Sequence, residues 1–136
     1  MTGIEKKRYD SEGYAPVVDF ESWRVELLNA TPEYVAESIA TAQRHTLTDE
    51  VFVLLKGSCV LLAFGEADAP GACEAVAMET GTIYNVRQNV WHSHVLAPGS
   101  KVLVVENRDT TVENSPVMPV DEAGRGEIIA LCQKLL

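Results

Sequence analysis

The sequence lacks several features that would assign it to large classes of protein. No apolar run approaches the roughly 20 residues that a membrane-spanning helix needs, so we expect no membrane association. The first ten residues carry charges but no apolar stretch follows them, which argues against a secretory signal. Lysine and arginine are scarce, 11 against 20 aspartates and glutamates, and the formal net charge of −9 argues against a nucleic-acid partner.

Cysteine is also sparse. The three cysteines form no C-x-x-C pair and no disulfide framework, which argues against a structural zinc site. Cys59 and Cys132 lie in apolar runs and are expected to be buried, whereas Cys73 flanks a glycine-containing loop. This pattern predicts a reduced protein in the cytoplasm.

Short apolar runs separated by turn residues are abundant. A chain of 136 residues that is 46% hydrophobic suits one domain with a proper core. Strands are predicted at residues 23–28, 51–55, 59–64, 83–86, 90–96 and 101–106, with weaker alternation at 73–78. Residues 56–58 predict a tight hairpin between two of them. This spacing predicts an all-β barrel or sandwich, and inward polar residues favour the barrel.

The remaining segments are less regular. Residues 1–15 are typical of a loose arm or an extended covering strand, and 31–33 of a short helical turn that leads into a strand ending at His45. After Asn107 a polar segment is expected to run along the surface. Residues from about 125 to 136 repeat apolar side chains at helical spacing, which predicts an amphipathic helix on the sheet or on a partner subunit.

Three side chains beside the predicted strands have the chemistry of a metal site. His45, Glu50 and His92 offer two imidazoles and a carboxylate, which zinc and non-haem iron, manganese or nickel accept. Side chains two apart in a strand share a face, so Gln43 joins His45 and His94 joins His92. If these faces look into one barrel, the three candidate ligands converge.

The spacing of these residues resembles the two motifs of the cupin superfamily. In the first motif, His45 and Glu50 take the histidine and glutamate and Gly57 the closing glycine. In the second, Gly81 and His92 take the opening glycine and the histidine. The resemblance covers about residues 20–107. It implies a small single-domain cupin barrel, of the double-stranded β-helix or jelly-roll type, in which His45, Glu50 and His92 bind a divalent metal.

The sequence departs from those motifs at several positions. Gln43 replaces the first histidine of motif one, and Arg87 and Asn89 stand where proline and glycine are usual. The site is therefore either a two-histidine, one-carboxylate set with open positions or a set that His94 completes. A third interpretation is that His45 and Glu50 form a buried hydrogen-bonded pair that holds no metal.

His94 and two further residues are candidates for contact with a ligand. His94 is interpreted as a fourth ligand, a rim residue or an acid or base, and we favour the last, because imidazole exchanges protons near neutral pH. Gln43 and Tyr84 are candidate substrate contacts. The predicted function is a small cupin that binds a divalent metal and a small polar metabolite, as an isomerase, lyase or hydrolase of a small carboxylate or sugar derivative. The alternative is a metal-free binding or sensing module.

The predicted strand at residues 51–55 is apolar on both faces. Val51, Val53 and Leu55 form the face that points away from Phe52 and Leu54. A strand of this kind needs a cover outside the barrel as well as inside. The C-terminal helix or a second subunit would supply it, and we predict a homodimer built on barrel strands.

Overall fold

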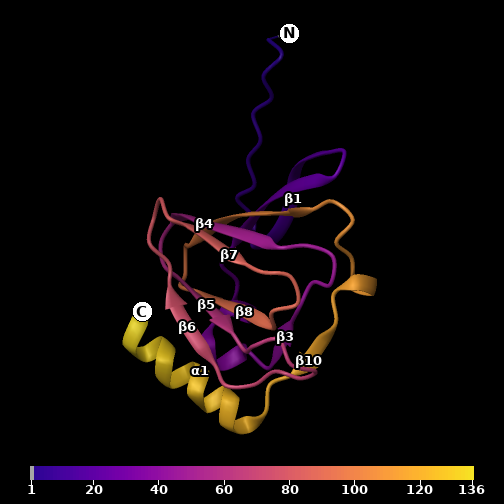
Figure 1. The fold of residues 1–136 in the computed structure, drawn as a ribbon. Helices are drawn as coiled ribbons and strands as arrows, with labels where there is room; N and C mark the ends of the chain where they lie inside the picture. Colours follow the sequence, from indigo (N-terminus) through magenta and orange to yellow (C-terminus); the bar gives the residue numbers. More distant parts are fainter. Residues whose placement is uncertain (1) are drawn as a thin grey trace.

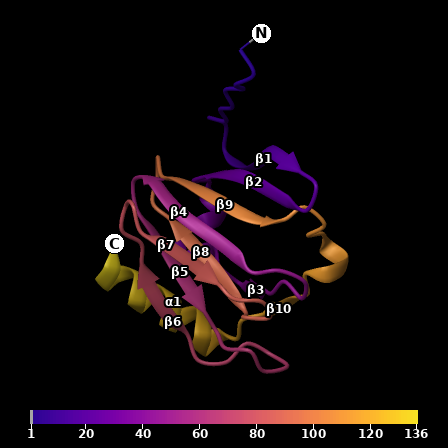
Figure 2. The same cartoon turned by 45° about the horizontal axis from the view of Figure 1, so that its top comes forward.

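Two five-stranded antiparallel sheets face each other and form a barrel in the computed structural model, which describes residues 2–136 (Figures 1 and 2). One sheet has the order β1-β2-β9-β4-β7 and the other β10-β3-β8-β5-β6. The strands are β1 (Gly13–Phe20), β2 (Trp23–Asn29), β3 (Thr41–Gln43), β4 (Glu50–Lys56), β5 (Cys59–Ala63), β6 (Glu74–Ala77), β7 (Ile83–Val86), β8 (His92–Leu96), β9 (Lys101–Asn107) and β10 (Val117–Pro119). The prediction of an all-β barrel is confirmed.

The turn at Gly57 is a corner between the sheets. β4 pairs with β7 and β9, whereas β5 pairs with β6 and β8, so the predicted hairpin between these strands is wrong. Gly57 has a φ of 80°, and a Cβ atom there would lie 2.8 Å from the Ser100 Cα atom. Glycine is therefore required by the backbone and by the close approach. A turn signal alone does not say whether the strands it joins pair with each other.

Alternate side chains of β2, β4, β8 and β9 line the barrel interior, and those of the paired strands β2, β9 and β4 lie in register. Each of these strands runs between a polar end and an apolar end of that interior. We define the polar end as Arg24, Glu26, Glu50, His92 and Glu106, and the apolar end as Leu28, Leu54, Leu96 and Val102. Phe52, His94 and Val104 lie between them along β4, β8 and β9. One end of the interior is thus hydrophobic core, and the other end holds the candidate site residues.

A second core lies between one sheet and the C-terminal helix. The helix α1 (Glu122–Leu135) contacts β5 and β6, and Ile128 and Cys132 are buried against that sheet (Figure 1). The helix starts slightly before the predicted residue because the Asp121 carboxylate caps it, accepting from the Gly124 N–H at 2.7 Å. Helix packing on the sheet is confirmed, as is the burial of Cys59 and Cys132.

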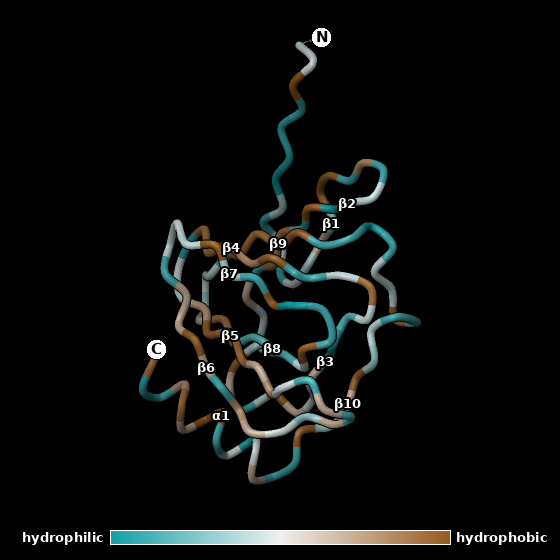
Figure 3. Tube along the Cα trace, viewed as in Figure 1, coloured by the Kyte–Doolittle hydropathy of each residue, from teal (hydrophilic) through white to brown (hydrophobic). Residues whose placement is uncertain are grey.

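The less regular segments follow their predictions only in part. Residues 31–38 form the short 3-10 helices η1 (Pro32–Tyr34) and η2 (Ala36–Ser38), and the strand that follows ends at Gln43 rather than at His45. The segment expected to run along the surface contains a third, η3 (Val112–Asn114), and also the strand β10, which pairs with β3. At the N-terminus a hydrophilic stretch leads away from the barrel, and pairing begins only at Gly13 (Figure 3).

In β2 the polar face points into the barrel and the apolar face points outward, the reverse of what the hydropathy of its residues favours. Trp23 and Val25 lie on the outer face, where Trp23 is 42% exposed, while Arg24 and Glu26 point into the barrel. Because side chains alternate, the polar face of this strand contributes to the polar end of the interior.

Among residues 2–136, no helix combines the length and apolar character that crossing a membrane requires.

Candidate metal centre

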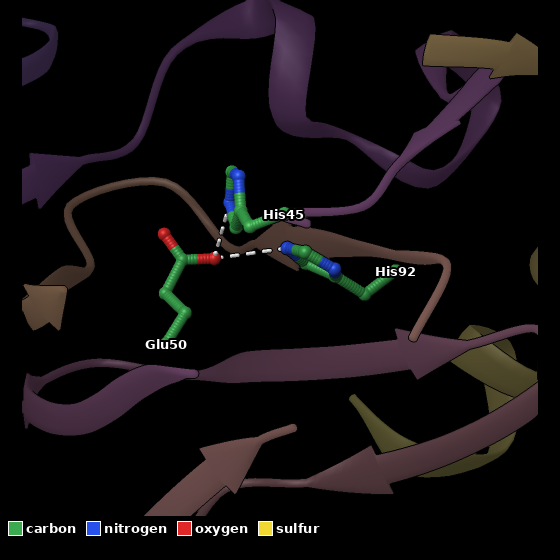
Figure 4. Close-up of side chains that lie close together, drawn as sticks. All are labelled: His45, Glu50 and His92. Atoms are coloured by element: carbon green, nitrogen blue, oxygen red, sulfur yellow. Dashed lines mark hydrogen bonds and ion pairs between the residues drawn. The ribbon is translucent and has the colours of Figure 1, made fainter. Parts of the chain in front are cut away.

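Three strand ends bring the predicted ligand residues together. His45 follows β3, Glu50 begins β4 and His92 begins β8. β3 pairs with β8 through Gln43 and His92, which places the start of β8 beside His45. All three side chains are buried, and one donor atom from each lies within 4.8 Å of the others (Figure 4). The convergence expected from strand alternation is therefore present.

Both imidazoles present the same nitrogen to the carboxylate. His45 Nε2 lies 3.2 Å from Glu50 Oε1, and His92 Nε2 lies 2.9 Å from the same oxygen. His92 Nδ1 lies 2.9 Å from the Val90 carbonyl, which only accepts hydrogen bonds, so this nitrogen carries a proton. His45 Nδ1 lies 2.7 Å from the Ser115 hydroxyl. Contacts at both Nδ1 atoms thus hold the two rings so that their Nε2 atoms face Glu50.

This orientation has an electrostatic consequence. With its proton on Nδ1, a neutral His92 would direct the lone pair of Nε2 at a carboxylate oxygen, and two acceptors at 2.9 Å repel each other. A positive group must therefore lie on or between them, either a proton on the imidazole or a metal cation. Metal-binding histidines commonly donate their second N–H to a carbonyl or similar acceptor, as His92 does here.

The pKa values follow from the same contacts. Burial works to lower the pKa of His45, but the hydrogen bond and charge of Glu50, with the charge of Glu106, raise it above its ordinary value. Burial works to raise the pKa of Glu50, but hydrogen bonds from His45 and His92 hold it well below its ordinary range. The carboxylate is therefore ionised, which is the form that a metal binds.

The donor set fits a divalent metal. Two imidazole nitrogens and one carboxylate oxygen match the protein ligands of zinc and of non-haem iron sites with open positions. The set is preassembled in the fold, buried, and supported by Ser115 and the Val90 carbonyl. The metal ion would be held by His45, Glu50 and His92.

Sequence reasoning missed a second group of charges beside these residues. Glu26 and Glu106 are buried, and Arg24 contacts both, with Nη2 3.0 Å from Glu106 Oε2 and Nε 3.4 Å from Glu26 Oε2. Burial, followed by Glu106, raises the pKa of Glu26 to about 9. Glu26, Glu50 and Glu106 offer oxygens within 4.8 Å of one another. The sequence signal for this group was the alternation of Arg24 and Glu26 with apolar residues in β2. It was missed because the apolar face of that strand was expected to point inward.

His94 lies deeper in the barrel, next to an open cavity. Its ring contacts that of Tyr34 edge-on, with 4.8 Å between centroids, and neither ring nitrogen has a hydrogen-bond partner among the described residues. Burial lowers the pKa of His94 to about 4, so its ring is neutral at physiological pH. The cavity, of about 580 Å³, is lined by residues of η1, by Ser93 and His94, and by residues 38–41.

The two predicted substrate contacts occupy different positions. Gln43 is the cross-strand partner of His92 and shares its face, which looks into the barrel. Tyr84 lies opposite Phe52 on β7, and its hydroxyl accepts a hydrogen bond from the Glu79 N–H at 2.8 Å. Neither residue lines the cavity beside His94.

Solved structures identify this architecture. A cupin-2 domain protein from Shewanella frigidimarina is 16% identical with a TM-score of 0.53, covering 74% of this chain and 85% of its own. The chain has a cupin fold. The chain is also similar to Pac13 of Streptomyces, a nucleoside dehydratase, at 11% identity and a TM-score of 0.57, covering 86% of this chain and 88% of that one.

A third structure adds another reaction. A 3,4-ketoisomerase from Helicobacter canadensis is 14% identical with a TM-score of 0.53, covering 81% of this chain and 74% of its own. No family model matches the sequence, and no curated protein is similar to it. At these identities the likeness establishes the fold and leaves the reaction to be argued from the site.

Proposed function

We propose that this cupin binds a divalent metal through His45, Glu50 and His92 and holds a small polar metabolite beside it. One observation carries the proposal: the Nε2 atoms of both imidazoles face a single ionised carboxylate oxygen, at 2.9 and 3.2 Å, while their Nδ1 atoms are engaged from behind. A metal cation satisfies that arrangement without requiring extra protons on the rings.

The reaction that suits such a site is isomerisation, elimination or hydrolysis of a small carboxylate or sugar derivative. When bound, the metal would act as a Lewis acid that polarises a carbonyl or hydroxyl of the ligand. An isomerase and a dehydratase among structures of similar fold support this range of reactions. The identity of the metal, whether zinc, iron, manganese or nickel, is left to measurement.

His94 is the residue we assign to proton transfer. It lies two positions along β8 from His92 and borders the cavity of about 580 Å³. Neither of its ring nitrogens has a hydrogen-bond partner among residues 2–136. A neutral ring donates from one nitrogen and accepts at the other. Gln43, which faces the barrel beside His92, and Tyr84, on β7, would bind polar groups of the ligand by hydrogen bonds.

Metal analysis tests this proposal. The protein is purified without chelator or nickel resin, and its metal content is measured by mass spectrometry. We expect about one equivalent of metal, lost in His45→Ala and in His92→Ala. The matched control is His94→Gln, which removes a neighbouring histidine from the same strand and should keep the metal. Absence of metal from the wild-type protein, after incubation with each candidate ion, would overturn the proposal.

Ligand binding and turnover are then measured on the loaded protein. Small carboxylates and sugar derivatives are screened by calorimetry and by product analysis. We expect His94→Gln to lower turnover while leaving metal content intact, because the residue contributes a proton acceptor and no metal ligand. A variant with wild-type turnover would remove His94 from the mechanism.

A second function is favoured by the hydrogen bonds themselves. With protonated imidazoles, Glu50 accepts from both rings, and the three side chains satisfy one another without metal. The barrel would then be a non-catalytic binding or sensing module. Metal content separates the two functions, since the module would bind its ligand equally well before and after chelation.

We also propose that the cupin is a homodimer joined through the outer face of the β1-β2-β9-β4-β7 sheet. Helix α1 lies on the other sheet, so it does not cover Val51, Val53 or Leu55, and Leu55 is 45% exposed. Light scattering after gel filtration should give twice the chain mass, and Leu55→Lys should give the monomer mass. A monomeric wild-type protein would contradict this assembly.

A further inference from the structure

Glu106 is a buried glutamate beside the candidate metal centre. It lies near the end of β9, and its Oε2 accepts a hydrogen bond from Arg24 Nη2 at 3.0 Å. Its Oε1 has no hydrogen-bond partner among the described residues and is shielded from solvent. That oxygen lies 3.8 Å from His45 Nε2, the nitrogen that also faces Glu50. A buried, unpartnered charged acceptor indicates that a ligand is missing.

The separations suit ligands of one ion. Two donors that each lie about 2.1 Å from a first-row metal are roughly 3 to 4 Å apart, depending on the angle between them. Glu50 Oε1 lies 2.9 and 3.2 Å from the two Nε2 atoms, and Glu106 Oε1 lies 3.8 Å from that of His45. Glu106 therefore lies beside the candidate centre and contacts one of its imidazoles from β9, a strand on which no ligand was predicted.

We propose that Glu106 is a fourth protein ligand of the metal centre, standing in for the imidazole that the sequence lacks at Gln43. This inference rests on the proposed metal site and adds a residue to it. Gln43 shares the face of His92 but supplies an amide, which binds transition metals weakly. The resulting set of two imidazoles and two carboxylates is richer in oxygen, and such sets suit harder ions such as manganese.

Arg24 positions this carboxylate. Its guanidinium contacts Glu26 Oε2 and Glu106 Oε2, leaving Glu106 Oε1 directed towards His45. Hydrogen bonds of this kind to the second oxygen of a ligating carboxylate are common around metals.

Glu26 provides a matched control for Glu106. Both are buried glutamates that contact Arg24, and within residues 2–136 neither oxygen of Glu26 and only one oxygen of Glu106 has a hydrogen-bond partner. Of the two, Glu106 alone contacts an imidazole of the candidate centre, with 3.8 Å between its Oε1 and His45 Nε2. Loss of a buried carboxyl group that contacts Arg24 would therefore affect both variants, whereas loss of a ligand would affect only one.

The test measures metal affinity by competition with a chromophoric chelator, for the wild type, Glu106→Gln and Glu26→Gln. We expect Glu106→Gln to bind manganese or zinc at least about tenfold more weakly, and Glu26→Gln to remain within about threefold of the wild type. In the cobalt-loaded protein, Glu106→Gln should change the visible absorption bands, which report coordination number and geometry. Melting curves without metal establish that both variants are folded.

A rescue variant makes the test decisive. Glu106→Gln combined with Gln43→His should recover most of the lost affinity, because residue 43 faces the site from β3. Equal affinities for wild type and Glu106→Gln, with His92→Ala still losing metal, would overturn this inference and leave the proposed function intact. If the wild type binds no metal at all, both fail. A larger loss in Glu26→Gln than in Glu106→Gln would also overturn it.

Discussion

The polar and apolar ends of the barrel interior are built by the same strands and have opposite effects on stability. β4 carries Glu50 at one end and Leu54 at the other, and β8 carries His92 and Leu96 in the same way. Side chains at the apolar end leave water and pack closely, which stabilises the fold. Charges at the polar end lose hydration and need partners to compensate. The packing of the apolar end therefore has to offset the cost of burying charges at the polar end of the same strands.

The largest expected effect comes from the apolar end. Leu54 is 3% exposed, and Leu54→Ala removes buried methyl groups and leaves a cavity, which should lower the free energy of unfolding by about 3 kcal/mol. Urea denaturation measures the change. Metal affinity should stay close to that of the wild type, because β4 still presents Glu50.

The control for this variant is Leu47→Ala. Leu47 is 54% exposed in the loop before β4, so the same substitution should alter stability by less than about 0.5 kcal/mol. A comparable loss in the two variants would mean that the apolar end is not the part of the interior that holds the barrel together.

At the polar end, Glu26→Gln should stabilise the metal-free protein at alkaline pH. The pKa of Glu26 is raised to about 9, so between its ordinary value near 4.5 and about 9 the unfolded chain releases a proton that the folded chain keeps. Stability therefore falls as pH rises through this window. Glutamine keeps the shape and removes the cost, with an expected gain at pH 8 of about 2 kcal/mol.

Melting temperatures measured from pH 5 to 9 in chelator test this expectation. The wild type should lose stability steadily towards high pH, and the curve of Glu26→Gln should be flatter. It will not be level, because the raised pKa of His45 adds a loss in the same direction once that imidazole gives up its proton. Parallel curves would indicate that Glu26 is already ionised in the folded protein.

The sequence predicted which side chains of β4 share a face, but it did not predict which face of β2 lies inside the barrel. Glu50, Phe52 and Leu54 were placed on one face because period-two alternation fixes which side chains lie together. Alternation does not say which face is inside, and in β2 the apolar phase with Trp23 lies outside while Glu26 lies inside. The second carboxylate group was therefore missed.

Contacts between distant segments were also beyond local patterns. The hairpin expected at Gly57 is a corner between sheets, since a turn sequence carries no information about which strands pair later. Ser115, which contacts His45, follows η3 in a segment expected to lie on the surface, 70 residues along the chain. The resemblance to cupin motifs singled out the candidate ligands, while the residues that orient them came only from tertiary structure.

The smallest expected effect tests that orientation. Ser115 is buried, with its hydroxyl 2.7 Å from His45 Nδ1 and 3.3 Å from Asn114 Oδ1, to which it donates. Because the Ser115 hydroxyl donates its hydrogen bond to Asn114, it accepts one from the Nδ1–H of His45, and the Nε2 lone pair is then directed at the proposed metal site. Ser115→Ala should cost about 1 kcal/mol in stability and about tenfold in metal affinity.

Thr46→Ala separates these two consequences. The Thr46 hydroxyl donates to the Asn114 carbonyl at 3.0 Å, so it ties down the same segment without touching the imidazole. We expect a similar loss of stability by urea denaturation and no loss of metal affinity by chelator competition. Because both variants loosen the loop around Asn114, a drop in affinity confined to Ser115→Ala would come from the ring of His45 itself. Equal affinities in the two variants would show instead that the carboxylate alone is sufficient to orient that ring.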